Sequence, residues 1–394
     1  MNDQGPLRVA TLLPVLGHPR DSKRVAMLQS EGIDVEVAAF ERDYHSGRLP
    51  SCRVTTLGRI SHGKYVARAM KFLRALPALR RVLRRCEVAY ASGPDMALAA
   101  IVAGMGLGKP VVMEIGDIRR LQVARGVAGA AMRAVDRFIA RRCSLLVSTA
   151  PGFVDGYYRK RLGASIPTLI LENKLDSRAI VGLVESIAAA SGNQGRVRIG
   201  WFGVLRCVWS WETLARLATA HPDRFEVVIA GHALDPKDLP QRASAVPNIR
   251  YLGEYRSPQD LASLYGQVDI VWTVYPGPEV MDPDWRWALL ASRSNRYYES
   301  CQYRRPIITL ADSGDGAEVI RLGHGAVLRS QRYEDVEASL LGISREDFAR
   351  WASVLERLPV STHSYTDEAR QLGDRIRQLA GRSVVSESNA RDSR

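Results

Sequence analysis

A lone carboxylate in the last third of the chain could recognise the sugar of a nucleotide. Glu299 lies among tyrosines and serines, and Pro306 then leads into the apolar run 307–310. We expect residues 297–303 to form a short helix and 307–310 a buried parallel strand, because β-branched runs of that length suit strands covered on both faces. A carboxylate on a helix beside such a strand is well placed to bind two vicinal hydroxyls, as on a ribose. The simpler interpretation is that Glu299 is an ordinary carboxylate on the surface of a helix. Other parts of the chain favour the ribose-binding interpretation.

A second segment could hold a diphosphate. Gly203-Val204-Leu205-Arg206 ends an apolar run and precedes a helical pattern. Glycine lets backbone amides approach a phosphate, and the positive end of a helix favours an anion. Arg206 could bind the diphosphate through paired N–H donors, with a further cation from Arg293 or Arg296; the alternative is an arginine on a solvated loop. Gly231-His232 ends the next apolar run, so His232 is a further candidate for contact with a ligand, although a lone histidine is more often structural.

Candidate acceptor-side residues lie in the first half of the chain. Glu114-Ile115-Gly116-Asp117 stands at the carboxyl end of a predicted strand, the edge where open α/β sheets bind ligands. Asp117 could deprotonate an acceptor hydroxyl if partial burial raised its pKa. The alternative is that Asp117 caps a following helix. The loop after the first strand contains His18 and Arg20, which we expect to bind the acceptor.

Strands and helices alternate in two series, which predicts an α/β fold with two doubly wound parallel sheets. The first series runs from a strand at 7–13 to one at 145–148, and the second begins at 197–202. Residues 188–196 between them have the composition of a linker. We therefore expect an N-terminal domain over 1–187, a C-terminal domain over 196–360, a C-terminal helix over 361–382 and a disordered tail over 383–394.

Composition and charge narrow the function classes. A chain of 394 residues is too long for one typical core. Its 55 Lys and Arg against 42 Asp and Glu give a net charge of +13, which indicates an anionic partner such as a nucleic acid, a membrane surface or a phosphorylated ligand. The five cysteines and seven histidines are scattered without metal-ligand spacing, so we expect reduced thiols in a cytosolic compartment and no metal. The sequence predicts neither a targeting signal nor a membrane-spanning helix.

The segment between Asp43 and Glu87 is strongly basic, with eleven Lys or Arg and no carboxylate. Its apolar side chains recur at helical spacing with cations on another face, and we expect Pro77 to divide two short helices. Such an element suits an anionic membrane surface, whereas the alternative is a core-facing helix with a solvated charged face. The expected membrane-facing residues are Lys64, Arg68, Lys71, Arg80, Arg81, Arg84 and Arg85.

The segment around Glu299 resembles the donor-binding helix of GT-B glycosyltransferases. Asn295, Glu299 and Pro306-Ile307-Ile308 match the family pattern, with Arg296 in place of the usual Lys. The resemblance implies two Rossmann-like domains facing a cleft, a metal-independent reaction, and a nucleotide ribose held by Glu299 with Asn295 and Arg296 beside it. Ala291 stands where many retaining members have a second Glu, so the pattern is compatible with retention or inversion.

Two segments extend the resemblance over about residues 7–380. Glu114-x-x-Asp117 is similar to a segment of bacterial polysaccharide glycosyltransferases. Residues 24–32, followed by 35–37 and 40–42, look like the opening helix and strand of exopolysaccharide enzymes of the succinoglycan type. The resemblance implies a hexosyltransferase with a UDP-sugar donor and Asp117 as its catalytic residue. It also implies a polyprenyl-diphosphate-linked saccharide acceptor, at the inner face of the cytoplasmic membrane.

Two other classes of protein fit parts of the sequence. A sugar-nucleotide epimerase could share the fold, but it would not need the basic element. A non-catalytic protein that binds an anionic polymer would explain the charge, although we expect no nucleic-acid partner because no RNA or DNA motif is present and aromatic residues do not interleave with the basic run.

Overall fold

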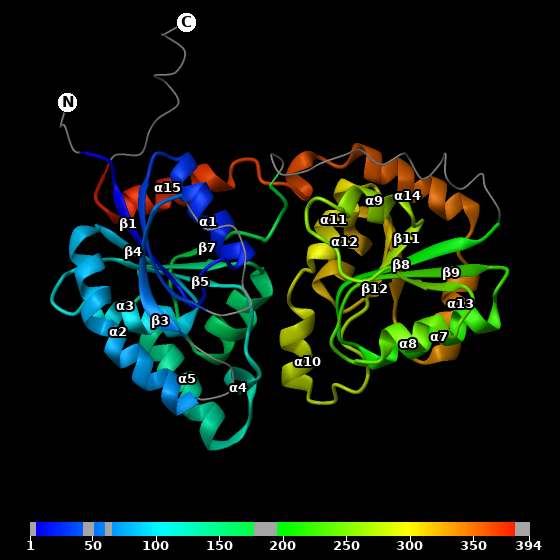
Figure 1. The fold of residues 1–394 in the computed structure, drawn as a ribbon, viewed down its shortest axis with the longest axis horizontal. Coiled ribbons are helices and arrows are strands. Elements are labelled where there is room, and N and C mark those ends of the chain that lie inside the picture. The colour runs from blue at the N-terminus through cyan, green and yellow to red at the C-terminus, as the bar shows by residue number, and fades with distance from the viewer. Residues whose placement is uncertain (1–4, 42–50, 60–64, 177–194, 383–394) are drawn as a thin grey trace, which may run out of the picture. The chain divides into compact units, whose positions relative to one another are not determined.

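The computed structural model describes residues 5–41, 51–59, 65–176 and 195–382. The chain divides into two compact units, of which the first is Met1–Asn173 with Asp367–Arg394 and the second is Lys174–Thr366. Each unit contains one parallel sheet with helices on both faces (Figure 1), so the expected pair of doubly wound α/β domains is confirmed. The tail expected at 383–394 lies outside the described residues, as does most of the expected linker.

The first unit is built on a seven-stranded parallel sheet in the order β3-β2-β1-β4-β5-β6-β7. Its strands are β1 (Arg8–Leu13), β2 (Asp34–Glu41), β3 (Arg53–Arg59), β4 (Val88–Ser92), β5 (Val111–Ile115), β6 (Leu145–Ser148) and β7 (Thr168–Ile170). Every residue of β4, β5 and β6 is buried, as expected for parallel strands covered on both faces. The strand order reverses between β1 and β4, and ligands bind at such a point in doubly wound folds.

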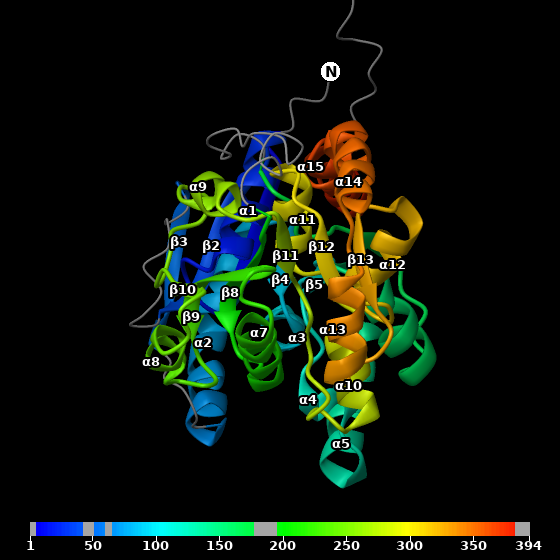
Figure 2. The ribbon, with the colours of Figure 1, turned by 90° about the vertical axis from the view of Figure 1, so that its right-hand side faces the viewer.

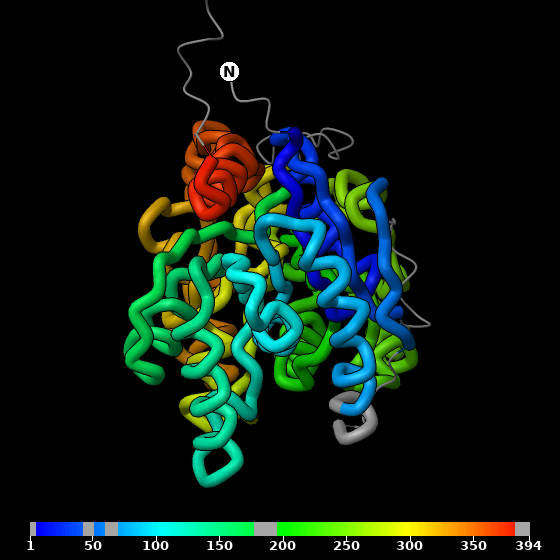
Figure 3. The backbone as a smooth tube through the Cα atoms, turned by 90° about the vertical axis from the view of Figure 1, so that its left-hand side faces the viewer, coloured from blue at the N-terminus to red at the C-terminus, as the bar shows by residue number. Residues whose placement is uncertain are grey.

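Helices cover both faces of the first sheet. They are α1 (Pro19–Ser30), α2 (Tyr65–Arg85), α3 (Pro94–Ala103), α4 (Arg120–Val123), α5 (Gly126–Ala140), the helix Phe153–Arg161 and α15 (Glu368–Leu379). Figure 3 shows α2, α3 and α5 side by side on one face, whereas α1 packs with α15. Helix α1 begins at Pro19, so His18 is its N-cap residue and Asp21 lies in its first turn.

Helix α2 is continuous through Pro77, so the expected division into two short helices is wrong. Proline removes one backbone donor and crowds the carbonyl four residues earlier, which here belongs to Leu73. Both Pro77 and Leu73 are exposed, so water can satisfy that carbonyl. The inner side of the helix stays packed through the buried Leu79 and Val82.

The second unit is built on a six-stranded parallel sheet in the order β10-β9-β8-β11-β12-β13. Its strands are β8 (Val197–Leu205), β9 (Phe225–Ala233), β10 (Ile249–Tyr251), β11 (Ile270–Trp272), β12 (Ile307–Leu310) and β13 (Gly325–Leu328). Its helices are α7 (Val208–Ala220), α8 (Leu239–Ser244), α9 (Leu261–Gly266), α10 (Pro283–Leu290), α11 (Asn295–Gln302), α12 (Gly314–Leu322), α13 (Tyr333–Leu341), α14 (Arg345–Arg357) and the turn Val360–Thr362. Helices α7 and α8 lie on one side of the sheet and α9, α11 and α12 on the other (Figures 1 and 2).

The first unit is discontinuous in sequence. Helix α15 returns to pack on α1, where Arg377 donates to the carbonyl of Glu31 at 2.6 Å, and Arg382 pairs with Glu87 at 2.6 Å. The chain passes to the second unit at residue 174, earlier than the expected boundary at 187, because Leu175 pairs with Ser364 of that unit. The expected C-terminal helix is therefore part of the first unit by its contacts.

Candidate functional site

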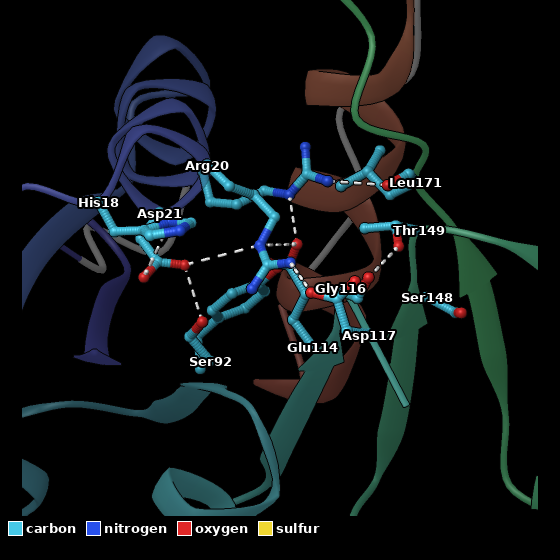
Figure 4. Close-up of polar contacts among 12 residues, drawn as sticks. His18, Arg20, Asp21, Ser92, Glu114, Gly116, Asp117, Ser148, Thr149 and Leu171 are labelled. Carbon is cyan, nitrogen blue, oxygen red and sulfur yellow. Dashed lines mark hydrogen bonds and ion pairs between the residues drawn. The ribbon is translucent and has the colours of Figure 1, made fainter. Parts of the chain in front are cut away.

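Polar side chains gather at the carboxyl edge of the first sheet (Figure 4). Ser92 is the last residue of β4 and Glu114 lies near the end of β5, while Asp21 and Arg24 come from the start of α1, which follows β1. Residues far apart in the sequence meet there because neighbouring parallel strands end at the same edge of a sheet.

Glu114 is a fully buried anion held by several donors. Its Oε1 accepts a 3.0 Å hydrogen bond from Nε of the equally buried Arg24, and its Oε2 accepts one from the hydroxyl of Tyr90. Arg24 also donates to the carbonyl of Leu171 at 2.8 Å. Burial acts to raise the pKa of Glu114, but the charges of Arg24 and Arg20 and these hydrogen bonds hold it below its usual value. Glu114 therefore stays ionised near neutral pH and holds Arg24 and Tyr90 in place at this edge of the sheet.

Asp21 is a buried carboxylate with the opposite behaviour. Its Oδ1 accepts a 2.7 Å hydrogen bond from the hydroxyl of Ser92, and its Oδ2 lies 3.8 Å from Nδ1 of His18. The Nε of Arg20 is 3.9 Å from Asp21 and 3.9 Å from Glu114. Burial raises the pKa of Asp21 to about 6. The charge of Arg20 lowers this pKa, but burial and the negative charge of Glu114 together have the larger effect. Asp21 therefore titrates close to neutral pH, as groups at functional sites often do.

Arg20 and Asp117 meet on the outer side of this edge. A Cβ on Gly116 would lie 1.3 Å from Nη1 of Arg20, so the arginine packs directly on that glycine. The same Nη1 is 4.0 Å from Oδ2 of Asp117, whose side chain is 84% exposed. The partial burial that a raised pKa requires falls on Asp21 instead. Arg119, and not Asp117, occupies the N-cap position of α4. The catalytic role of Asp117 stays a prediction.

Asp21, Ser92 and Arg24 were not among the residues predicted for this site. Ser92 ends a short apolar strand, and Arg24 lies within the pattern of an ordinary amphipathic helix, so neither has a local signal. One signal was present for Asp21: His18 and Asp21 are spaced as an N-cap residue and the third residue after it, which places their side chains on one turn.

Replacing Asp21 by asparagine should stabilise the first unit at pH 8. The pKa of Asp21 rises from 3.8 in the unfolded chain to about 6, so the folded state disfavours the charged form above about pH 6 and has no such penalty below 3.8. At about 1.4 kcal/mol per tenfold change in the ionisation constant, the penalty is about 3 kcal/mol. Denaturation followed by far-UV circular dichroism should show a gain at pH 8 that shrinks at pH 4. An equal gain at both pH values would exclude the charge of Asp21 as its cause.

The predicted donor residues lie at the carboxyl edge of the second sheet. Strand β8 ends at Leu205 and α7 begins at Val208, which confirms the predicted strand end at Gly203–Arg206. Gly203 and Gly231 are paired across β8 and β9, and a Cβ on Gly231 would lie 1.8 Å from the carbonyl oxygen of Gly203. Only glycine permits this approach, and it leaves the backbone uncovered where a phosphate could bind.

Helix α11 places Arg296 and Glu299 beside this glycine pair. Arg296 donates to a main-chain carbonyl of β8 at 2.8 Å, and its Nη1 is 3.5 Å from where a Cβ on Gly203 would lie. Glu299 is buried and accepts a 2.8 Å hydrogen bond from the hydroxyl of Tyr265. Burial, and then the charge of Glu299, raise the pKa of Tyr255, whose hydroxyl is 4.0 Å from the same Cβ position. The structure thus brings Gly203, Arg296 and Glu299 together.

The other predicted donor residues lie on the surface of the second unit. Arg206 is exposed, with its guanidinium carbon 4.8 Å from the ring centroid of Tyr275. The side chain of His232 is 62% exposed, and its Nδ1 lies 2.7 Å from Glu254. Asn295 is exposed at the start of α11. These positions are accessible to a ligand, and the donor-binding roles of the three residues stay predictions.

Several cations expected to face a membrane have partners within the first unit. Arg80 donates to two carbonyls at the end of α3, each at 2.8 Å. Arg85 is paired with Glu36 on β2, and Lys71 donates to the backbone of β3. These three side chains therefore help to hold α2 to its neighbours.

Within the described part of the chain, no three histidine, cysteine or carboxylate side chains gather closely enough to hold a metal ion. None of the helices described is long and apolar enough to cross a membrane. A metal-independent reaction is implied by the sequence resemblance and stays a prediction.

Comparison with known proteins identifies the class of this fold. Residues 24–171 match the family model of a glycosyl transferase 4-like domain. The succinoglycan biosynthesis protein ExoL of Rhizobium meliloti is 29% identical over 378 residues, which cover 93% of this chain and 88% of ExoL. The structure of HepE of Anabaena in complex with UDP and glucose has a TM-score of 0.68 at 14% identity, covering 94% of this chain and 99% of HepE. A UDP-N-acetylglucosamine 2-epimerase has a TM-score of 0.57 at 10% identity, covering 96% of this chain and 97% of the epimerase.

The two doubly wound units and these relatives define the chain as a glycosyltransferase of the GT-B fold. More narrowly, residues 24–171 are similar to glycosyl transferase 4-like domains, and the chain is similar over most of its length to the succinoglycan biosynthesis protein ExoL. The fold and the transferase class implied by the sequence resemblance are confirmed.

Proposed function

We propose that this protein transfers a hexose from a UDP-sugar to a polyprenyl-diphosphate-linked saccharide in exopolysaccharide synthesis. The observation that carries the proposal is the convergence of Gly203, Arg296 and Glu299 at one edge of the second sheet. Exposed backbone and a guanidinium suit a diphosphate, and a buried carboxylate suits ribose hydroxyls. The part of ExoL in succinoglycan biosynthesis and the UDP bound to HepE support this pathway class and this donor.

Arg296 is positioned to stabilise the leaving group. During transfer the bond between the anomeric carbon and the diphosphate breaks, and negative charge grows on the diphosphate. The Nη1 of Arg296 is fixed by a carbonyl of β8, while its buried Nε has no hydrogen-bond partner among the described residues. A guanidinium that is held in place with an N–H still to satisfy is preorganised for an anion. Arg206, on the exposed side, would add a second cation.

A sugar-nucleotide epimerase is the second candidate, because such an enzyme shares the fold. An epimerase acts on a soluble nucleotide sugar and has no use for a basic surface that binds membranes. A non-catalytic polymer-binding protein would need that surface but has no use for a buried carboxylate beside a glycine pair. Both features together favour the transferase.

One assay separates these functions. The purified protein is incubated with a panel of nucleotide sugars, with and without lipid-linked saccharide, and the products are resolved by mass spectrometry. We expect sugar transfer and UDP release that require the acceptor. Conversion of the nucleotide sugar without acceptor would identify an epimerase, and no conversion under either condition would reject both enzymes.

An exposed face of α2 supports a location at the inner surface of the cytoplasmic membrane. Met70 and Leu73 are 49% and 60% exposed, and the exposed Arg74, Arg81 and Arg84 continue the same face at helical spacing. Apolar and cationic side chains mixed on one face suit an anionic bilayer. Helix α5, beyond α3 (Figure 3), adds exposed apolar side chains, among them Val127 and Phe138. Lys64 and the side chain of Arg68 lie outside the described residues.

Replacing Arg74, Arg81 and Arg84 by glutamine should weaken binding to anionic vesicles about a hundredfold, since each cation contributes about 1 kcal/mol. Co-sedimentation of the wild type should also be lost in 1 M salt, where the Debye length is about 3 Å. The matched control removes three exposed arginines of α14, namely Arg345, Arg350 and Arg357, and should bind as the wild type does. Equal loss in both triple variants would mean that net charge, not this face, sets membrane binding.

A further inference from the structure

We propose that the hydroxyl of Tyr255 donates a hydrogen bond to the 2′ oxygen of the donor ribose, so that the protein selects ribonucleotide donors over 2′-deoxyribonucleotide donors. The inference deepens the proposed function and rests on it, because it takes the nucleotide to lie at the glycine pair beside Glu299. It adds a specificity-determining residue that was not among those predicted from the sequence.

Tyr255 approaches the glycine pair from a different part of the second sheet than Arg296 and Glu299 do. Tyr255 follows β10, whereas α11 leads into β12, and β10 and β12 lie on opposite sides of β8 (Figure 2). The hydroxyl of Tyr255 nevertheless lies 4.0 Å from the position of a Cβ on Gly203, and Nη1 of Arg296 lies 3.5 Å from the same position. Side chains from both sides of β8 therefore meet at Gly203.

The hydroxyl of Tyr255 is close to charged groups but has no hydrogen-bond partner within the part of the chain that the structure describes. Burial raises the pKa of Tyr255, and the charge of Glu299 raises it further, while the charge of Arg296 lowers it. The phenol therefore stays protonated near neutral pH and can donate a hydrogen bond. The side chain is partly exposed, so a ligand can reach this hydroxyl.

A ribose at this place needs a hydrogen-bond donor as well as an acceptor. A carboxylate accepts the protons of the ribose hydroxyls, which leaves the lone pairs of the hydroxyl oxygens without a donor. A phenol supplies such a donor, and a tyrosine hydroxyl is fixed in place by its rigid ring.

The approach of Tyr255 from β10 favours the 2′ oxygen. The cations proposed to bind the diphosphate are Arg206, just past the end of β8, and Arg296 on α11. The nucleobase is attached to the other end of the ribose, which then faces β9 and β10. The ribose carbon next to the base carries the 2′ hydroxyl, so this is the hydroxyl that Tyr255 meets.

Tyr303 is a second tyrosine close to Glu299, and it provides a matched control. Burial, and then the charge of Glu299, raise its pKa as they raise that of Tyr255. However, Tyr303 is only 2% exposed, and its ring packs against that of Tyr265 with the centroids 5.2 Å apart. Its hydroxyl is buried, so it lies near the carboxylate without being accessible to a ligand.

Tyr255→Phe removes the hydroxyl and keeps the ring. Titration calorimetry should show that this variant binds UDP about three- to tenfold more weakly than the wild type, the range expected for one hydrogen bond. Its affinity for 2′-deoxy-UDP should equal that of the wild type, because this ligand lacks the oxygen that Tyr255 contacts. Tyr303→Phe should bind both ligands as the wild type does. Tryptophan fluorescence should confirm that the second unit is folded in each variant.

Three results would overturn the inference. Equal losses for UDP and 2′-deoxy-UDP in Tyr255→Phe would mean that the hydroxyl contacts another part of the nucleotide, and unchanged UDP affinity would mean that it contacts none. An equally selective loss in Tyr303→Phe would assign the effect to the surroundings of Glu299 and not to a direct contact.

Failure of the proposed function is distinguishable from failure of this inference. A wild-type protein that binds no UDP would reject the proposed donor and the inference together. Acceptor-dependent transfer from a UDP-sugar by the wild type, without a UDP-selective loss in Tyr255→Phe, would reject the inference alone.

Discussion

Glu114→Ala should lower the free energy of unfolding of the first unit by about 3–5 kcal/mol, since it leaves a buried charge without its partner. Arg24, fully buried, loses the carboxylate 3.0 Å from its Nε, and Tyr90 loses its acceptor. The pKa of Glu114 is held below its ordinary value of 4.5, so the ionised group stabilises the folded state above that pH and loses its effect as the pH falls through the lowered value. The loss should therefore be complete at pH 7 and persist at pH 5.

The distribution of tryptophan makes this measurement specific. All seven tryptophans lie between Trp201 and Trp351 in the second unit. Tryptophan fluorescence should therefore be unchanged in Glu114→Ala, while far-UV circular dichroism shows the early loss of the first unit. The double variant Arg24→Met with Glu114→Leu should recover most of the stability, because an apolar pair leaves no charge uncompensated.

Glu87→Ala is the matched control for that experiment. Glu87 forms an ion pair with Arg382 in the same unit, but both side chains are partly exposed. Removing a solvated pair of this kind costs about 0–1 kcal/mol. If Glu114→Ala is no less stable than Glu87→Ala, the buried pair does not hold the first unit together.

Glu299→Gln should weaken UDP binding by at least tenfold while the second unit stays folded. The carboxylate would accept two charge-assisted hydrogen bonds from the ribose, and losing them costs about 1.5–3 kcal/mol. Glutamine keeps the shape and can still accept the hydrogen bond from Tyr265, which is 2.8 Å long in the wild type. Titration calorimetry measures the affinity, and tryptophan fluorescence confirms the fold of this unit.

Two further variants serve as controls for the Glu299→Gln measurement. Tyr265→Phe removes the donor to Glu299 but leaves the carboxylate, so it should weaken UDP binding less than Glu299→Gln does. Glu337→Gln removes a carboxylate that is paired with His221 on the surface, and it should bind UDP normally. UDP affinity in Glu299→Gln equal to that of Glu337→Gln would reject the ribose assignment.

Much of the fold could be predicted because many of its strands are short runs of consecutive apolar residues. Strands 145–148 and 307–310 have the predicted bounds, since β-branched runs in a parallel sheet carry their own signal. The predictions failed where tertiary contacts override local rules. Pro77 does not break α2 because it lies on the exposed side of the helix. Edge strand β3 has a largely exposed, polar pattern, and its pairing with β2 is supported by contacts such as that of Arg53 with Glu36, which no local pattern reveals.

In the candidate sites, too, some features could be predicted from local sequence and others depend on tertiary contacts. Gly203, Arg296 and Glu299 could be predicted because each stands near a strand of one sheet, and the carboxyl ends of such strands converge. The sequence alone could not predict which aspartate at the edge of the first sheet is buried, Asp21 or Asp117. Asp21 is buried where it accepts a hydrogen bond from Ser92 of β4, while the side chain of Asp117 projects from a loop and is 84% exposed. Burial of a charged side chain is a property of the assembled sheet and helix, and neither segment encodes it alone.

The return of α15 to the first unit bears on how the protein is made. The second unit is contiguous and complete once Thr366 has left the ribosome, whereas the first still lacks the helix that packs on α1. At that stage Glu31 and Glu87 have not yet formed their contacts with Arg377 and Arg382. Domains usually fold in the order of their synthesis, but here the unit that is translated first is finished last. A nonsense mutation near the end of the gene would therefore damage the unit encoded at its beginning.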